Sequence, residues 1–395
     1  MQGTQLNNIA GAQFRANPQY RLTLFDRLPP EQQEWLRDLR NDPDHYGVLL
    51  PAEGIGRSIK AVCRETALLF FTLQEPGPLP GYVQTLFGAE AGQEIAELVL
   101  DGVLEIAQGE AFVSGAEASA LIYEAAPPPA ESGVIARLSE DALRYAQTLD
   151  VDDPQMLSAR LYFYNRLPVS PAWQRQFATP DAVRAFLGLN PPGSELVRRG
   201  RRWAETPLPP PYDGWLMWQA RDAAREDAPC TYKLYVSPRP ESLRDAFWET
   251  VDTLSDLGVS RFKIGKDVYG LLRPDKVVAY FTDFQVVEEA AHRLERALAG
   301  CPAHGVPFTA EIGGDGLLSW GMDPPRAQQA LGWQERESWR LWVTNRLATA
   351  LLAARAAPPP DRQPWQFAVE RLALEGVDTH TWTPRTTLWQ DSGGK

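Results

Sequence analysis

Alternating apolar and polar positions predict three strands in the middle of the chain. The segments 232–236, 261–264 and 276–281 each alternate apolar side chains with basic or phenolic ones. Every second side chain of a strand points to the same face, so each of these strands has one apolar and one polar face. If the strands are neighbours in one sheet, their cations converge, and a bound phosphate would balance them. The polar positions are Lys233 and Tyr235, Arg261 and Lys263, and Lys276 and Tyr280.

Three segments between and after these strands have apolar residues at helical spacing. Apolar residues from Leu243 to Leu254 predict a helix that ends at Gly258, and residues 287–298 predict a second helix capped by Thr282 or Asp283. A last helix is expected at 336–353. The glycines between 305 and 321 predict tight turns near a site or a hairpin, without Rossmann or P-loop spacing. Mixed strands and helices make residues 212–357 an α+β domain.

Residues 1–126 are expected to form a small helical unit that ends in a wing. Helical patterns cover 67–73 and 92–102, and the short strands 103–106 and 111–113 can pair as a hairpin. Helices followed by a hairpin are typical of a winged-helix unit, and a generic helical cap is the alternative interpretation. The low positive charge of this region favours peptide docking over DNA binding.

Residues 130–206 are predicted to be a helical segment, with Ser139 as an N-cap. The aromatic run at 161–168 is interpreted as core and a helix end, and substrate lining is the alternative. Residues 361–395 are expected to be a C-terminal helix and tail. Proline clusters mark the boundaries between these parts, because such clusters favour extended connections. They lie at 127–129, 207–211 and 358–360.

Composition limits the classes of partner. The chain has 395 residues, of which 44% are hydrophobic and 23% charged, and its net charge of −12 disfavours nucleic acid and anionic membranes. Cys63, Cys230 and Cys301 are widely spaced, so neither a zinc site nor a disulfide framework is expected. We expect a cytoplasmic location, because no signal-peptide pattern opens the chain and no apolar run reaches the ~20 residues that span a bilayer.

Four short motifs carry a family resemblance: Tyr232–Pro238, Arg261–Gly265, Leu272–Lys276 and Ala279–Phe281. They resemble the Hop-A-type family, which takes its name from a bacterial type III effector. That family includes the lyase components of class V lanthipeptide and thioamitide gene clusters. The resemblance covers roughly residues 135–355 and extends to the OspF-type phosphothreonine lyases and to the lyase domains of class III and IV lanthipeptide synthetases.

The resemblance implies elimination of phosphate from phosphoserine or phosphothreonine, without metal or cofactor, to leave a dehydroamino acid. Lys263 would remove the Cα proton, which requires a neutral amine and therefore a lowered pKa. Arg273 and Lys276 would hold the phosphate, and Tyr280 would hydrogen-bond it. Lys233 would stabilise the enolate-like carbonyl oxygen of the substrate.

Tyr235 departs from the pattern, because the phosphothreonine lyases carry a histidine general acid at this position. With an ordinary pKa near ~10, a tyrosine is a weaker proton donor. His292 is a second candidate acid, although a histidine on such a helix is more often a surface residue. Glu311 and Asp315, beside the glycine turns, are either structural or orient a lysine. The remaining histidines, His45, His304 and His380, have no supporting pattern.

Three functions stay open at this point. The first is a lyase that acts on a phosphorylated precursor peptide, with a separate partner kinase that resembles an aminoglycoside phosphotransferase. The second is a protein that binds phosphopeptide or scaffolds the kinase without catalysis, which the tyrosine at position 235 favours. The third is a type III effector, and the long structured N-terminal part argues against it.

Overall fold

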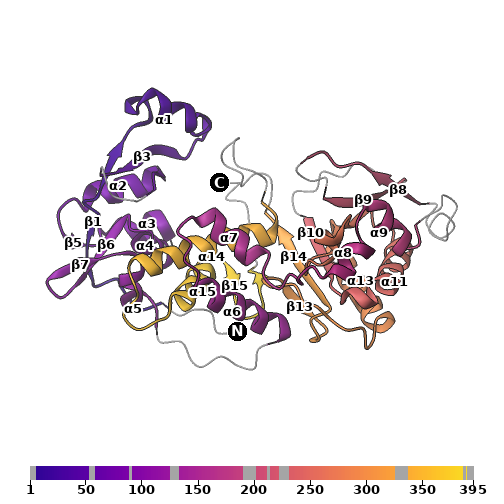
Figure 1. Cartoon of the computed structure of the whole chain (residues 1–395). Coiled ribbons are helices and arrows are strands. Elements are labelled where there is room, and N and C mark those ends of the chain that lie inside the picture. The colour runs from indigo at the N-terminus through magenta and orange to yellow at the C-terminus, as the bar shows by residue number, and fades with distance from the viewer. Residues whose placement is uncertain are drawn as a thin grey trace. The chain divides into compact units, whose positions relative to one another are not determined.

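The computed structural model describes residues 6–52, 58–88, 91–124, 133–189, 202–210, 214–221, 231–324, 337–385 and Leu388. The chain divides into two compact units, each of which combines segments that are distant in sequence (Figure 1). Unit 1 comprises Met1–Pro128, Ala327–Arg336 and Thr349–Glu375. Unit 2 comprises Pro129–Arg326, Glu337–Ala348 and Gly376–Lys395.

Unit 1 contains two small antiparallel sheets and short helices. The first sheet has the order β5 (Gly77–Pro78), β1 (Gln13–Ala16), β6 (Leu104–Gln108) and β7 (Ala111–Val113). The second has the order β2 (Tyr20–Thr23), β3 (His45–Pro51) and β4 (Lys60–Cys63). The helices are α1 (Pro30–Trp35), α2 (Arg64–Thr72), α3 (Val83–Phe87), α4 (Ala91–Leu100), α5 (Ser119–Ile122) and α15 (Pro364–Leu374).

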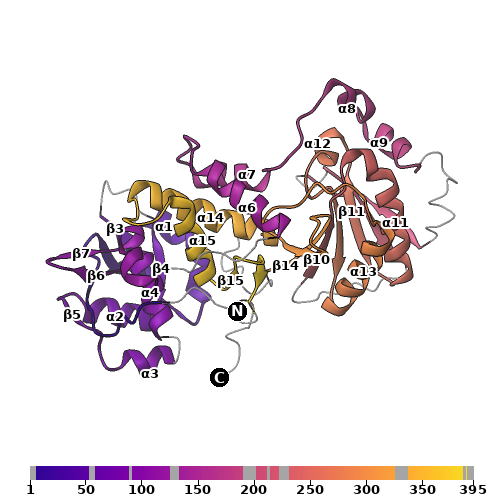
Figure 2. The same cartoon turned by 90° about the horizontal axis from the view of Figure 1, so that it is seen from below.

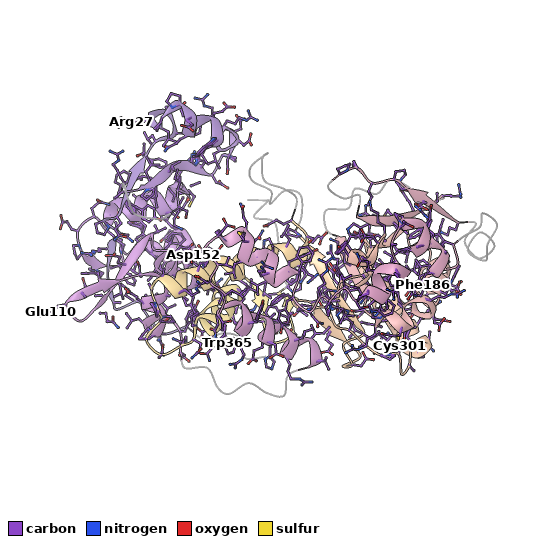
Figure 3. The ribbon with its side chains drawn as sticks, in the orientation of Figure 1. Arg27, Glu110, Asp152, Phe186, Cys301 and Trp365 are labelled. Atoms are coloured by element: carbon purple, nitrogen blue, oxygen red, sulfur yellow. The ribbon has the colours of Figure 1, made fainter. Side chains whose placement is uncertain are left out.

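The predicted hairpin of unit 1 is confirmed, because β6 pairs with β7 and Glu110 lies in the turn between them (Figure 3). The two predicted helices are confirmed as α2 and α4. The prediction of a helical unit missed strands β1 to β4. The partner of β1 lies far along the chain: Arg15 of β1 lies opposite Glu105 of β6, which local patterning does not reveal. The strands β2, β3 and β4 pair with one another. The winged-helix arrangement stays a prediction.

Unit 2 is built on a seven-stranded antiparallel sheet in the order β13-β14-β10-β12-β11-β9-β8. The three strands predicted from alternation are confirmed and are neighbours: β10 (Thr231–Val236), β12 (Val277–Phe281) and β11 (Arg261–Gly265). The hairpin β13-β14, in the glycine-rich segment, forms one edge of the sheet, and β9 and β8 form the other edge. Their bounds are β13 (Ala310–Ile312), β14 (Leu318–Asp323), β9 (Trp215–Ala220) and β8 (Trp203–Thr206).

One face of this sheet packs against α11 (Leu243–Asp256) and α13 (Phe284–Ala297), which lie along the same face in both views (Figures 1 and 2). Leu234, Phe262 and Ala279 of the three central strands are fully buried in the core between sheet and helices. Because side chains alternate along a strand, the basic residues next to them in sequence point to the opposite face. The α+β class is therefore confirmed for this unit.

The predicted helical segment contains α6 (Val134–Ala146), α7 (Pro154–Tyr162), α8 (Pro171–Gln176) and α9 (Pro180–Phe186). The prediction of Ser139 as an N-cap is wrong. The helix α6 begins earlier, and the Ser139 hydroxyl donates to the carbonyl of Ile135 one turn back inside it. The cap of α13 is Asp283, whose carboxylate accepts from the Gln285 N–H, as predicted.

Three elements remain. The last predicted helix is confirmed as α14 (Trp339–Ala356), whose residues up to Ala348 belong to unit 2 and whose residues from Thr349 belong to unit 1. A short helix α12 (Val268–Leu271) follows β11. A two-stranded sheet joins β15 (Val377–Asp378) and β16 (Thr383–Pro384). The proline cluster at 127–129 lies outside the described residues. Over the ranges described above, none of the helices combines the length and the hydropathy that a membrane span requires.

Candidate active site

The second face of the central sheet gathers basic and phenolic side chains from three strands. Lys233 of β10 and Arg261 of β11 both lie opposite Tyr280 of β12, one on each side. The Tyr280 ring centre is 5.4 Å from Lys233 Nζ, 5.8 Å from Lys263 Nζ and 4.7 Å from Arg261 Cζ. Because the face of an aromatic ring attracts cations, Tyr280 lets three positive charges share one surface. Burial raises the pKa of Tyr280, so its hydroxyl stays neutral.

Lys263 lies at the centre of this surface. Its Nζ is 3.9 Å from the ring centre of Trp215 on β9, and it makes no hydrogen bond or ion pair with another described residue. Burial lowers the pKa of Lys263; the negative charge of Asp275 opposes this shift, and the positive charge of Arg273 adds to it. A larger fraction of this amine is therefore neutral than in an exposed lysine, as a general base requires.

Arg273 lies beside Lys263 on the same aromatic ring, with its Cζ 4.8 Å from the centre of Trp215. Its Nε and Nη2 each donate to the carboxylate of Asp275 over 2.8 Å, and Nη2 also donates to the Tyr162 hydroxyl at 3.3 Å. Among the described residues, none accepts a hydrogen bond from Nη1. The side chain keeps 15% of its surface exposed, so its open edge can receive an anion.

Asp275 supplies one negative charge to two guanidinium groups. Nη1 of Arg340, on α14, lies 2.9 Å from its Oδ2, and Arg340 also donates to the carbonyls of Tyr162 and Pro307. Burial opposes ionisation of Asp275, but Arg273 and Arg340 outweigh it and hold the pKa of this carboxyl well below its usual range. Because two cations share one carboxylate, the cluster keeps a net positive charge beside Lys263.

Lys233 is paired as well as buried. Its Nζ lies 2.5 Å from Oδ2 of Asp323, at the end of β14, and the other oxygen of Asp323 accepts from the Trp339 N–H at the start of α14. Gly321, opposite Lys233 across the ladder, is needed here because a Cβ would lie 2.5 Å from the Trp339 ring. Lys233 is therefore held in one position at the rim of the cationic surface.

Tyr235 lies on the same face, buried between Val278 and Val306. Burial, with the negative charge of Asp323 adding to it, raises its pKa well above the ordinary value, so the hydroxyl retains its proton and is a weak acid. His292 does not replace it. That residue is exposed on α13, which covers the opposite, apolar face of the sheet.

The sequence predicted Lys276 to hold phosphate on the polar face of the sheet, whereas the structure places it in the protein interior. It directly precedes β12 and is fully buried, with Nζ 2.8 Å from Nδ1 of His304. Nε2 of His304 donates to the carbonyl of Asn165 at 2.6 Å, so Nδ1 is the acceptor and Lys276 is the donor. Burial lowers the pKa of Lys276 to about 7 and that of His304 to about 3. Lys276 therefore fixes the interior next to Arg273 and Asp275 and has no open surface for a phosphate.

Lys276 makes the stability of the fold depend on pH. In the unfolded chain a lysine titrates near 10.5, so between pH 7 and 10.5 the unfolded state holds more protons and the free energy of unfolding rises with pH. We expect Lys276→Met to lower this slope by up to about 1.4 kcal/mol per pH unit. Urea unfolding between pH 7 and 10 measures the slope, with Lys266→Met as control. An unchanged slope in Lys276→Met would mean that Lys276 is not a buried amine of low pKa.

The two acidic residues beside the glycine turns have structural contacts. Oε2 of Glu311 accepts from the Ile135 N–H at the start of α6, and Oδ1 of Asp315 accepts from the Leu317 N–H. Neither residue orients a lysine of the site. The cations Lys233 and Arg273 pair with Asp323 and Asp275. Within the described ranges, no three His, Cys, Asp or Glu side chains cluster as a metal site would.

Five side chains of the site were not predicted from the sequence. Asp275 lies only two residues from Arg273, inside one of the motifs, but no role was predicted for it. The other four reach the site from elements distant in the chain, and among them only the aromatic run at 161–168 was interpreted, as the alternative, as substrate lining. These four are Tyr162, Trp215, Asp323 and Arg340.

No protein-family model matches the chain, and no curated protein is similar in sequence. Solved structures do show similarity. An effector protein from Pseudomonas syringae pv. tomato strain DC3000 is 15% identical over 64% of this chain and 98% of its own, with a TM-score of 0.38. The type III effector and phosphothreonine lyase OspF from Shigella flexneri is 11% identical over 40% of this chain and 86% of its own, with a TM-score of 0.27. The phosphothreonine lyase SpvC from Salmonella is 14% identical over 51% of this chain and 98% of its own, with a TM-score of 0.26.

Proposed function

We propose that this protein eliminates phosphate from a phosphothreonine or phosphoserine residue of a peptide. The observation that carries the proposal is the pair formed by Lys263 and Arg273 on one ring. Their cationic groups lie 3.9 and 4.8 Å from the centre of Trp215, so a base and an anion holder are within reach of a single phosphorylated residue. The excess positive charge around Asp275 favours an anionic ligand.

The proposed reaction needs a base, an anion holder and a stabiliser of the carbanion. The neutral amine of Lys263 takes the Cα proton, and the electron pair of the C–H bond forms the Cα–Cβ double bond. The Cβ–O bond breaks, and the phosphate leaves as an anion on Arg273. Lys233 faces the negative charge that develops on the neighbouring carbonyl oxygen. Arg261 and Tyr280 keep the surface positive and ordered around the substrate.

The leaving group does not depend on Tyr235 as an acid in this scheme. Its high pKa makes proton transfer unfavourable. A phosphate ester bound as the monoanion already carries a proton, so the phosphate leaves as HPO4²⁻, which the cations neutralise. We therefore expect Tyr235→Phe to lower kcat by less than about 10-fold, below the range for loss of a general acid or base. Single-turnover rates on a phosphothreonine peptide test this. A loss of a thousandfold or more would make Tyr235 the general acid.

We further propose that the substrate is a phosphorylated precursor peptide of lanthipeptide-type biosynthesis, processed in the cytoplasm. This rests on the sequence resemblance to class V lyase components. A separate kinase, of the kind that resembles aminoglycoside phosphotransferases, would then supply the phosphopeptide. No metal or cofactor is assigned a role in the proposed reaction.

The test is incubation of the full chain with a phosphothreonine peptide, followed by mass spectrometry. The expected result is a loss equal to the mass of phosphoric acid and a product that adds a thiol at the new double bond. A precursor peptide phosphorylated by its own kinase serves as the second substrate. Unchanged peptide in both experiments would overturn the proposal.

A phosphopeptide-binding protein without turnover is the second candidate function. The buried Tyr235, in place of a readily protonated group, favours it. Tight binding of the phosphothreonine peptide, by fluorescence anisotropy, combined with no mass loss would support this function. Competition by inorganic phosphate would locate the binding at the Arg273 surface.

A further inference from the structure

Arg166 is a half-buried cation beside the site that the proposed reaction does not use. It follows α7, and its Cζ lies 5.7 Å from the ring centre of Phe163 and 5.3 Å from that of Tyr269. Nη2 donates to the carbonyl of Tyr269 at 2.9 Å, and no described carboxylate pairs with the guanidinium. The two rings are 41% and 55% exposed, so they place accessible apolar surface on both sides of the contact with this guanidinium.

The backbone around Arg166 is held in place. Asn165 adopts a left-handed conformation with φ of 63°, and its side-chain amide donates to the carbonyls of His304 and Gly305. The N–H of Leu167 donates to the carbonyl of Leu272 at 3.0 Å. Arg166 is therefore tied through its neighbour in sequence to the residue that precedes Arg273. The backbone segments that carry Arg166 and Arg273 are therefore held next to each other.

Arg166 and Arg273 also share a ring. The Cζ of Arg273 lies 5.2 Å from the centre of Phe163, the same ring that Arg166 covers. Burial lowers the pKa of Arg166, and the charge of Arg273 adds to the shift, so an anion near both groups relieves their repulsion. Consecutive Cα atoms of a peptide are about 3.8 Å apart, so a residue one or two positions from a phosphothreonine on Arg273 can reach Arg166.

We propose that Arg166, Phe163 and Tyr269 form a specificity subsite for an anionic side chain within two residues of the phosphorylated residue. This inference rests on the proposed function, because it places the phosphate on Arg273. The guanidinium would accept a carboxylate or a second phosphate, while the two rings cover the aliphatic part of the bound side chain. The subsite therefore selects acidic peptides over neutral ones.

The test uses phosphothreonine peptides that differ only at the flanking positions. Glutamate is compared with glutamine, and phosphoserine with serine, so that the two sources of negative charge are separated. Dissociation constants and kcat/KM are measured for the wild type, for Arg166→Gln and for the control Arg293→Gln, whose residue pairs with Glu289 on α13. We expect the wild type and the control to prefer the acidic peptides by about 3- to 10-fold, and Arg166→Gln to lose the preference.

Two results overturn the inference: equal binding of acidic and neutral peptides by the wild type, or the same preference in Arg166→Gln. Binding is measured independently of turnover, so the outcome separates the two proposals. A preference that Arg166→Gln abolishes, with no phosphate eliminated from any peptide, supports the subsite and contradicts the lyase. Elimination at equal rates from all peptides, with equal affinities, supports the lyase and contradicts the subsite.

Discussion

Replacement of Lys263 by alanine is expected to lower kcat for phosphate elimination by about 10²- to 10⁴-fold, the range for loss of a general base. Binding of the phosphopeptide should persist, because Arg273 and its partner Asp275 are untouched. Lys263→Arg separates charge from basicity: the guanidinium keeps the positive charge but does not lose its proton near neutral pH. We expect Lys263→Arg to bind the peptide and to be as inactive as Lys263→Ala.

The measurement is single-turnover mass loss from a phosphothreonine peptide, combined with anisotropy for binding. Lys266→Ala, just beyond the same strand, is the matched control and should retain activity. In the wild type, kcat/KM should rise with pH, because the neutral amine is the active form, and the midpoint should lie below the ordinary lysine value of about 10.4. Substantial turnover by Lys263→Arg would contradict the role of Lys263 as base.

Replacement of Asp275 by asparagine is expected to destabilise unit 2 by about 3–5 kcal/mol, the usual cost of removing one partner from a buried ion pair. Asp275 is 3% exposed, and its loss leaves Arg340, which is 1% exposed, without its carboxylate. The same change removes the charge that Arg273 pairs with and leaves one acceptor oxygen where there were two, so the affinity for phosphate should also change.

Urea unfolding followed by tryptophan fluorescence measures the first effect. Asp181→Asn is the control, because that carboxylate pairs with Arg184 while 82% exposed and should contribute less than about 1 kcal/mol. A loss of under 1 kcal/mol in Asp275→Asn would show that the buried charge cluster does not stabilise the fold. At low pH the cost should fall as the wild-type carboxyl is protonated, which occurs well below its usual range.

Alternation along three short strands predicted the faces of the central sheet. Within each strand every second side chain points the same way, whatever the partners of the strand are. The pairing of β10, β12 and β11 then places Lys233, Lys263 and Tyr280 on one surface. Local signals also predicted the helices α11, α13 and α14 and the cap at Asp283. They failed at Ser139, where a residue with good capping chemistry lies inside a helix.

The order of the strands and the charge partners were decided by tertiary structure. Asp323, Trp215 and Arg340 reach the site from a hairpin, an edge strand and a late helix, and no local pattern links them to Lys263. Burial depends on the same non-local packing, since the alternating pattern placed both Lys276 and Lys263 on polar strand faces. In the structure Lys276 hydrogen-bonds His304 in the interior, whereas Lys263 lies against the Trp215 ring at the surface of the site.

By itself, the sequence determined which side chains can share a face, because strand periodicity is a local property of the backbone. It also indicated an anion site, since cations on one face repel each other unless a negative charge is present. Only the tertiary structure decided which of these cations pair with Asp275 and Asp323 and which, such as Lys263 and Arg261, have no ion-pair partner among the described residues. The reason is that ion pairing and desolvation depend on distances between segments that are remote in the chain.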